Sequence, residues 1–365
     1  MRLMVDARMA HHSGIGRYIR GLCRALADRE DVSISYLTSD PDPLEWEQDA
    51  PRLGYPAPIY SVREQLAGST VMARHRRRHD LVHVPHYNAP WALPARSVIT
   101  VHDLVHFRIA GAGARPRIWL ARQVLERALY RAARVVVPSD ATRRDLEALV
   151  PPVRGKIRVI PHGVDEKFRG GWQPPAGRPA TILSLITAKP HKNLPMLLAA
   201  FRRVLAERPD ARLRLIGVNA DDAAISGARN VEGLGLVSDE ALVEHYREAS
   251  LLAMPSRLEG FGFPALEAMA CGTPVVASNC DALEELCGGA AATVPVSDPH
   301  PLAHVLLRVL GDPGLRQDLS ERGRKRAAHF SWQRCAEQTL EAYREAMRGG
   351  PARVERRASA TDAPA

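Results

Sequence analysis

The chain has 365 residues, 45% of them hydrophobic, and a formal net charge of +9. This length exceeds one ordinary hydrophobic core and predicts two domains, while no apolar run reaches the roughly 18 residues that span a membrane. The first residues carry no secretion signal and the five cysteines have no paired spacing, so we expect a cytoplasmic protein with reduced thiols.

Strand-like and helix-like segments alternate along the chain, which predicts an α/β protein with parallel sheets covered by helices. In the first half we expect strands at residues 3–6, 32–37, 81–84, 98–101, 135–137 and 157–160. The clearest helices between these strands are residues 16–27, 116–131 and 139–149, and Ser139 is the expected N-cap of the last.

The second half repeats this plan, with strands expected at residues 182–186, 213–216, 251–254, 274–277 and 292–294. We therefore expect two Rossmann-like domains, joined where glycine and proline residues cluster. The expected N-terminal domain, linker, C-terminal domain, last helix and disordered tail are residues 1–165, 166–178, 179–330, 331–348 and 349–365.

Glycines follow the first strand in the motif SGIGRY, residues 13–18. Free amides at a helix N-terminus attract anions, so Gly14 and Gly16 mark a candidate cradle for a phosphate or an acceptor. The motif lacks the third glycine of the dinucleotide fingerprint, although Asp40 follows the second strand as a ribose-binding acid would. A nicotinamide oxidoreductase is therefore an alternative at this point.

Histidines follow neighbouring strands of the first half. His86 lies in HVPHYN, and His102 and Asp103 lie in TVHDLVHF at the end of an expected strand. Ligands of open parallel sheets bind at the carboxyl ends of the strands, so we expect these side chains to point toward a cleft. The later motif PHGVDEKF has a structural interpretation, in which Gly163 permits a tight turn.

Two charged motifs distinguish the second half. SLITAKPHKNLP places Lys192 at a helix start, where a cation and the helix end can stabilise a diphosphate. RLEGFGFPALEAMAC places Glu259 before a turn and Glu267 in the expected first turn of a helix, with Pro264 at its first position. One carboxylate can face sugar hydroxyls and the other a ribose. The pattern predicts a nucleotide-sugar site that includes the loop residues Gly260, Phe261, Gly262 and Phe263.

The spacing of the two glutamates, with GFGFP between them and CGTPVVAS after them, resembles the signature of retaining GT-B glycosyltransferases of family 4. The resemblance implies two Rossmann-like domains that face each other across a cleft, with a C-terminal helix that returns to the N-terminal domain. It also implies that Gly14 and Gly16 face the donor phosphates and that His102 contacts the donor sugar. Lys192 matches the lysine of the family, and His86 and Asp103 are expected near the acceptor.

The chain departs from the family pattern at Thr187, where an arginine is common about five residues before the lysine. Lys189 is one candidate to supply the missing charge. In the family, the segment at residues 231–235 borders the base of the nucleotide, although a purely structural strand and turn is an equal interpretation.

We predict a hexosyltransferase that retains the anomeric configuration and needs no metal or other cofactor. Lys192, the amides around Gly262 and the following helix end would stabilise the leaving diphosphate, whose oxygen deprotonates the acceptor. Glu259 would position the sugar. The motifs HVPHYN, TVHDL and PHGVD look most like bacterial mannosyltransferases of surface polysaccharides, which favours GDP-mannose and a saccharide or lipid-linked acceptor.

Other interpretations stay open. A UDP- or dTDP-sugar with a small natural-product acceptor fits the same family, and a sugar-nucleotide-binding protein without catalysis fits the same site. Asp40-Pro41-Asp42 resembles the D-x-D metal motif of GT-A glycosyltransferases, but that assignment leaves the second domain unexplained.

The basic surface includes arginines at residues 74–78 and has two interpretations, a solvated face or a peripheral contact with an anionic membrane. We expect no nucleic-acid partner, because no recognised module and no interleaved aromatics accompany the basic residues.

Overall fold

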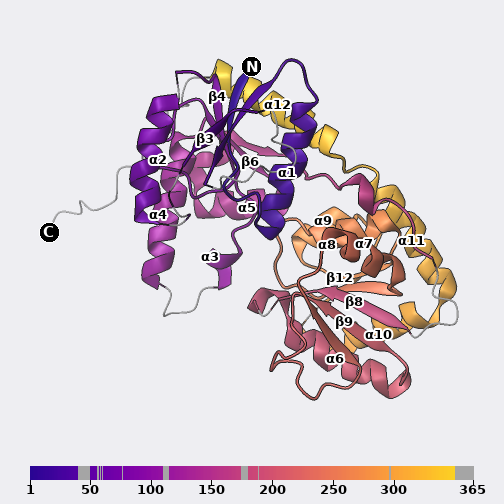
Figure 1. The fold of residues 1–365 in the computed structure, drawn as a ribbon. Helices are drawn as coiled ribbons and strands as arrows, with labels where there is room; N and C mark the ends of the chain where they lie inside the picture. Colours follow the sequence, from indigo (N-terminus) through magenta and orange to yellow (C-terminus); the bar gives the residue numbers. More distant parts are fainter. Residues whose placement is uncertain are drawn as a thin grey trace.

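The computed structural model describes residues 1–349 except 40–49, 56, 58, 60, 76, 110–114, 174–179, 188 and 296, and contains two α/β domains (Figure 1). The D-x-D candidate Asp40-Pro41-Asp42 lies outside the described residues, and so do residues 350–365 of the expected tail.

The described residues of the N-terminal domain form a seven-stranded parallel sheet in the order β3-β2-β1-β4-β5-β6-β7. The strands are β1 Arg2–Asp6, β2 Ser33–Thr38, β3 Arg52–Gly54, β4 Leu81–Val84, β5 Ser97–Thr100, β6 Arg134–Val137 and β7 Ile157–Val159. The helices are α1 Ser13–Ala27, α2 Val62–His75, α3 Val105–Ile109, α4 Arg115–Arg131, α5 Asp140–Leu149 and the short η2 Pro151–Lys156. The sequence misses β3 because this short edge strand carries no apolar run.

In the C-terminal domain, the part of the chain that the structure describes forms a six-stranded parallel sheet in the order β10-β9-β8-β11-β12-β13. Its strands are β8 Thr181–Leu185, β9 Arg212–Ile216, β10 Val231–Gly235, β11 Leu251–Met254, β12 Val275–Ser278 and β13 Ala292–Val294. The helical elements are η4 Pro190–Lys192, α6 Leu194–Glu207, α7 Asp239–Glu248, α8 Phe263–Cys271, α9 Asp281–Cys287, α10 Pro299–Gly311 and α11 Pro313–Ala327. The segment expected to border a base is therefore an edge strand, β10.

Both sheets confirm the expected pattern of buried strands. Every residue of β4, β5, β11 and β12 is buried, as parallel strands covered by helices on both faces require. The expected N-cap Ser139 is also confirmed, because its side chain accepts a hydrogen bond from the Thr142 amide at 3.1 Å. Ser238 caps α7 in the same way and accepts a hydrogen bond from the Ala241 amide at 3.2 Å. All five cysteines are free.

The last helix, α12 Trp332–Arg348, leaves the C-terminal domain and packs on the N-terminal one beside α1, which confirms the expected return (Figure 1). Its Tyr343 hydroxyl lies 2.7 Å from Nδ1 of His83 in β4, and its Glu345 accepts a hydrogen bond from Arg134 of β6 at 2.8 Å. The helix therefore belongs to the core of the first domain.

The expected linker differs from the structure in its first half. Residues 166–168 form the short helix η3, Glu166–Phe168, and Phe168 is buried in the core of the C-terminal domain. The Trp172 indole donates a hydrogen bond to the Ala249 carbonyl at 2.9 Å. These two aromatic side chains bury apolar surface, so this stretch packs as part of the second domain.

Candidate active site

The structure brings Lys192 and Glu259 together. Lys192 ends η4 after β8, Glu259 lies in the loop after β11, and the lysine Nζ donates a hydrogen bond to Glu259 Oε1 at 2.7 Å. The two side chains are 20% and 11% exposed. Both groups can therefore reach a ligand. When no ligand is bound, the ion pair holds the two side chains in place.

The loop after Glu259 touches the N-terminal domain at Gly260. A side chain at this position would overlap the carbonyl oxygen of His102 and lie 2.8 Å from Cβ of Asp103, so only glycine permits the approach. The Gly260 carbonyl also accepts hydrogen bonds from Ser139 Oγ at 2.7 Å and Thr142 Oγ1 at 3.2 Å. The loop predicted to bind the donor is thus fixed between the two domains.

His102 lies just beyond β5 and forms a chain of hydrogen bonds. Its Nε2 lies 2.9 Å from the Pro85 carbonyl, and its Nδ1 lies 3.2 Å from Nε2 of His162. Burial lowers the pKa of His102 to about 4 and holds the pKa of His162 well below its usual value, so both rings are neutral at pH 7. A carbonyl only accepts, so His102 carries its proton on Nε2 and accepts from His162 at Nδ1.

Glu267 is the fifth residue of α8, so its predicted place in the first helical turn is wrong. Pro264 is the second residue, because the helix begins at Phe263 rather than at the proline. The Glu267 carboxylate is buried, accepts a hydrogen bond from the Tyr246 hydroxyl at 3.0 Å and forms an ion pair with Arg17.

Arg17 comes from α1 of the other domain. Its guanidinium also donates to Asp239 Oδ1 at 2.9 Å, and it lies 5.3 Å from the centre of the Phe168 ring. Arg17 therefore joins the helix that carries the first glycine motif to the carboxylate predicted to bind a ribose.

The glycines of the first motif have different surroundings. Because α1 begins at Ser13, both lie in its first turn and not in a loop before it. Gly14 is exposed with open space around it, whereas a side chain on Gly16 would overlap the Ala10 carbonyl. Gly14 is thus the one of the pair that leaves a helix N-terminus accessible to an anion.

The loop glycine Gly262 has φ of 107°, a left-handed conformation that favours glycine, and it directly precedes α8. Phe261 is buried and Phe263 is partly buried, and both rings pack against the His162 ring. These aromatic side chains support the loop, whose residues Gly260, Phe261 and Gly262 are buried.

The two residues predicted to lie near an acceptor differ in exposure, because His86 is buried and Asp103 is only partly buried. His86 is 1% exposed, and its Nε2 lies 3.5 Å from Oδ2 of the buried Asp6. Burial would raise the pKa of Asp6, but the Arg8 charge and the contact with His86 hold it well below its usual value. Asp103 accepts a hydrogen bond from the Val105 amide at 3.1 Å at the start of α3.

Thr187 stands where the family commonly has an arginine, and its hydroxyl is buried with no hydrogen-bond partner among the described residues. Lys189, the candidate to replace that charge, is exposed directly before η4. In the described part of the chain, no group of three or more His, Cys, Asp or Glu side chains is arranged to hold a metal ion.

Three further residues belong to this site although the sequence does not predict them: Arg17, Asp239 and His162. Arg17 and His162 stand inside motifs that were singled out, SGIGRY and PHGVDEKF, but only the fold reveals their partners. Asp239 has no sequence signal beyond its place at a helix start.

Comparisons with known proteins assign the family. Residues 12–168 match the family described as Glycosyltransferase Family 4, and residues 171–326 match Glycosyl transferases group 1. A D-inositol 3-phosphate glycosyltransferase of Kineococcus radiotolerans is 32% identical over 327 residues, with 75% of this chain and 74% of the relative covered. The chain belongs to glycosyltransferase family 4.

Two further similarities extend this result to nearly the whole chain. The O-antigen chain mannosyltransferase B of Escherichia coli is 29% identical, with 91% of this chain and 96% of the relative covered. The solved structure of a sucrose-phosphate synthase from Thermosynechococcus elongatus superposes with a TM-score of 0.77 at 23% identity, and covers 94% of this chain and 98% of its own. The GT-B fold and the glycosyltransferase activity predicted from the sequence are thus confirmed.

Proposed function

We propose that this glycosyltransferase transfers mannose from GDP-mannose, with retention of configuration, to a saccharide or lipid-linked saccharide of a bacterial surface polysaccharide. The observation that carries the proposal is the Lys192–Glu259 ion pair, at 2.7 Å, on the loop that contacts His102. The similarity to an O-antigen chain mannosyltransferase over 91% of this chain supports mannose as the sugar.

In the proposed reaction, the donor diphosphate binds between Gly14 and the loop at Gly262, and Lys192 moves from Glu259 to the phosphate. The lysine and the N-terminus of α8 stabilise the charge that develops as the diphosphate leaves. Glu259, released from the lysine, accepts hydrogen bonds from the sugar hydroxyls and orients the ring.

A leaving diphosphate oxygen then takes the acceptor proton on the same face of the sugar, which retains the configuration. His102 is neutral, and both of its ring nitrogens are paired within the protein, to the Pro85 carbonyl and to His162. We therefore assign it to holding the end of β5 in place beside the donor loop rather than to proton transfer. Lys192 and the helix end supply the positive charge, and the proposed step requires no metal ion.

A panel of GDP-, UDP- and dTDP-sugars tests the donor through the melting temperature. At equal ligand concentrations, the donor that binds most tightly raises the melting temperature most, and we expect this donor to be GDP-mannose. A ligand at 100 times its Kd stabilises the folded state by about 2.7 kcal/mol. NMR of the product should show the anomeric configuration of the donor, and excess EDTA should leave the rate unchanged. A larger rise with a UDP-sugar contradicts the donor assignment.

The second candidate keeps the enzyme class but uses a UDP- or dTDP-sugar as donor and a small molecule as acceptor. The similarity to a D-inositol 3-phosphate glycosyltransferase favours a small acceptor over a polysaccharide. Transfer to a small polyol phosphate, with no transfer to a mannosylated oligosaccharide, would support it. Donor hydrolysis and transfer assays on wild type and Glu259→Ala distinguish both candidates from a protein that binds the donor without catalysis.

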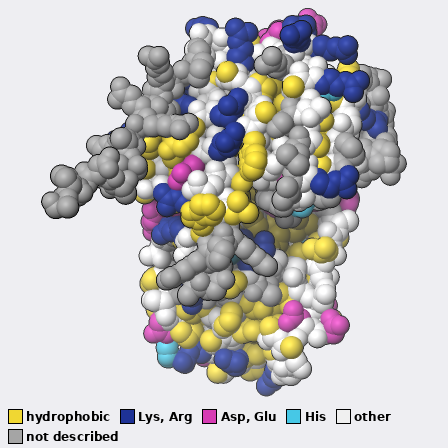
Figure 2. Space-filling model, turned by 90° about the vertical axis from the view of Figure 1, so that its left-hand side faces the viewer, with side chains coloured by type: hydrophobic (Ala, Val, Ile, Leu, Met, Phe, Trp, Pro, Cys, Tyr) yellow, Lys and Arg dark blue, Asp and Glu magenta, His cyan; other side chains and the backbone are white. Residues whose placement is uncertain are grey.

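We also propose that the N-terminal domain contacts an anionic membrane through α4. Large hydrophobic side chains that are exposed in the described residues include Trp119, Leu120 and Tyr130 of α4 and the neighbouring Trp91, whose ring lies 5.5 Å from the Arg127 guanidinium. Arg122 and Arg131 are exposed on the same helix. Figure 2 views the side of the molecule that carries α2 and α4, where hydrophobic surface adjoins Lys and Arg side chains.

Aromatic side chains beside arginines suit the interface of an anionic bilayer, where each basic residue contributes about 1 kcal/mol. Within the described chain, no helix combines the length and apolarity needed to cross a membrane. We expect the protein to sediment with vesicles of 30% anionic lipid at low salt and not with neutral vesicles. Trp119→Ala should reduce sedimentation, whereas Leu236→Ala, which removes an exposed side chain from the other domain, should not. Equal binding to both vesicles would contradict the proposal.

A further inference from the structure

A cavity of about 300 Å³ lies at the junction of the two domains, outside the predicted donor site. The N-terminal domain contributes the ends of β6 and β7, the C-terminal domain contributes α9 and the donor loop, and the chain that crosses between them closes the wall. Of the residues predicted to bind the donor, only Phe261 lines this cavity. Its size is at the lower end of the range for small-molecule sites.

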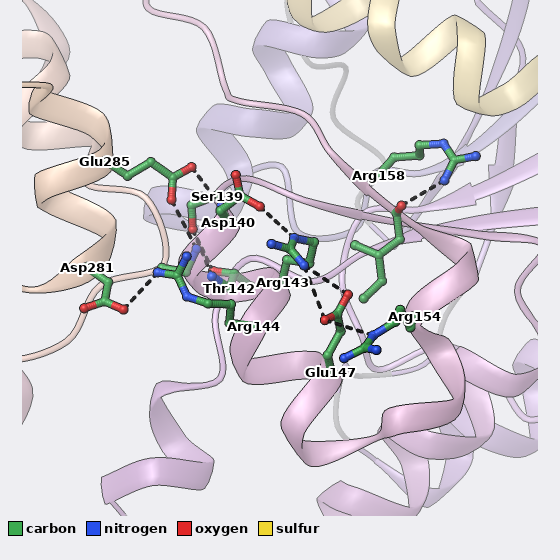
Figure 3. Close-up of polar contacts among 12 residues, drawn as sticks. Ser139, Asp140, Thr142, Arg143, Arg144, Glu147, Arg154, Arg158, Asp281 and Glu285 are labelled. Atoms are coloured by element: carbon green, nitrogen blue, oxygen red, sulfur yellow. Dashed lines mark hydrogen bonds and ion pairs between the residues drawn. The ribbon is translucent and has the colours of Figure 1, made fainter.

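The charged lining of the cavity favours an anion. Glu285 is the acid of the lining, and its carboxylate accepts hydrogen bonds from the Asp140 and Ala141 amides at 2.8 and 3.1 Å, which satisfies it. Figure 3 shows this carboxylate directed at the start of α5. Arg326 donates to the Leu286 and Glu285 carbonyls at 2.8 Å, so it remains a cation beside neutral partners.

Arg334 supplies a second cation. It lies in the first turn of α12, is exposed, and its guanidinium has no ion-pair or hydrogen-bond partner among the described residues. The two guanidinium groups outnumber the one carboxylate of the lining, whose oxygens already accept hydrogen bonds from backbone amides, so positive charge is in excess. Guanidinium groups bind phosphate oxygens in a bidentate manner.

One further polar side chain of the lining, His162, has an acceptor nitrogen that a ligand hydroxyl can satisfy. His162 lines the cavity and is 1% exposed, and its Nδ1 is buried with no hydrogen-bond partner among the described residues. Because His162 donates its Nε2 proton to His102, the neutral ring leaves Nδ1 as an acceptor. A buried acceptor without a donor is costly, and a ligand hydroxyl would satisfy it.

Aromatic surface completes the lining. Phe261 and Phe330 both line the cavity, and the centroids of their rings are 6.1 Å apart. Sugar rings present C–H faces that pack on aromatic side chains, together with hydroxyls that serve as donors. A small phosphorylated sugar matches all three parts of the lining. Its phosphate can bind the arginines, its hydroxyls can donate to His162, and its apolar face can pack on the phenyl rings.

We propose that this cavity is a regulatory site for a small sugar phosphate that acts on the donor loop. Each of three lining residues is bonded to the predicted active site or is part of it: His162 to His102, Ser139 to the Gly260 carbonyl, and Phe261 in the loop itself. A ligand that touches both domains here favours the closed arrangement in which these contacts exist.

Isothermal titration calorimetry with glucose 6-phosphate tests the site, with glucose and inorganic phosphate as partial probes. We expect glucose 6-phosphate to bind more tightly than either probe, and Arg334→Ala to weaken its binding at least ten-fold. Arg344→Ala is the matched control, since it removes the same charge from the same helix about 15 Å away. It should bind like the wild type.

Competition separates this proposal from the donor site. Saturation with the nucleoside diphosphate that the protein binds should not displace glucose 6-phosphate, and each ligand should change the affinity of the other by the same factor. Calorimetry reads binding alone, so these results do not depend on GDP-mannose being the donor. Absence of glucose 6-phosphate binding, its displacement by the diphosphate, equal losses in Arg334→Ala and Arg344→Ala, or affinities that do not change each other would overturn the proposal.

Discussion

Gly260→Ala tests whether catalysis requires the close contact between the donor loop and the end of β5. The added methyl would overlap the His102 carbonyl and lie 2.8 Å from Asp103 Cβ, and neither group is a flexible side-chain tip. Overpacking of this kind costs about 1–3 kcal/mol. Gly260 has no left-handed φ, so the substitution adds no backbone strain of its own.

The penalty acts across the domain boundary, and the two domains can relieve it by moving apart. We therefore expect kcat/KM to fall by about 5- to 150-fold, the factor that corresponds to 1–3 kcal/mol, while the midpoint of urea unfolding changes little. Small-angle scattering should show a larger radius of gyration for the variant than for the wild type.

Gly311→Ala is the matched control, because a side chain at this last residue of α10 meets no atom within 4 Å. It should retain wild-type activity. Wild-type kcat/KM in Gly260→Ala would refute the reasoning, because the contact would then have no part in the active arrangement.

Three further predictions concern charge. Arg17→Ala leaves the buried Glu267 carboxylate without its cation and should lower the free energy of unfolding by about 3 kcal/mol. In urea titrations, the double variant with Glu267→Gln should recover most of this loss. Additive losses from the two substitutions would contradict the importance of the ion pair. Burial lowers the pKa of His83 to about 3 and of His102 to about 4, whereas the unfolded side chains titrate near 6.5. The free energy of unfolding should therefore fall as the pH decreases from about 6.5 to about 4, by about 1.4 kcal/mol per pH unit for each such histidine, and His83→Gln should reduce that slope; a flat profile contradicts the assignment. Lys192→Ala should weaken nucleoside diphosphate binding about 10- to 100-fold by calorimetry, as expected for loss of a charge-assisted hydrogen bond, and unchanged affinity would exclude the lysine from phosphate binding.

The sequence determined the fold class and the places of most strands, because continuous apolar runs between glycine and proline turns have few other interpretations. It also determined which loops follow the carboxyl ends of the strands, and hence that Lys192, Glu259 and His102 belong to loops that can meet. The sequence did not predict the edge strand β3 or the short helix η3, because neither has a periodic hydrophobic pattern.

Only the tertiary structure decided the partners of these side chains. Arg17 and Glu267 are 250 positions apart in the numbering, and their ion pair exists because the tertiary structure brings the start of α1 in one domain close to α8 in the other. The cavity at the domain junction is likewise formed by segments from both halves, and no local pattern shows that Ser139, His162 and Phe261 meet there. Local sequence fixes the elements through hydrophobic periodicity, whereas contacts between distant charged groups depend on the packing of the whole chain.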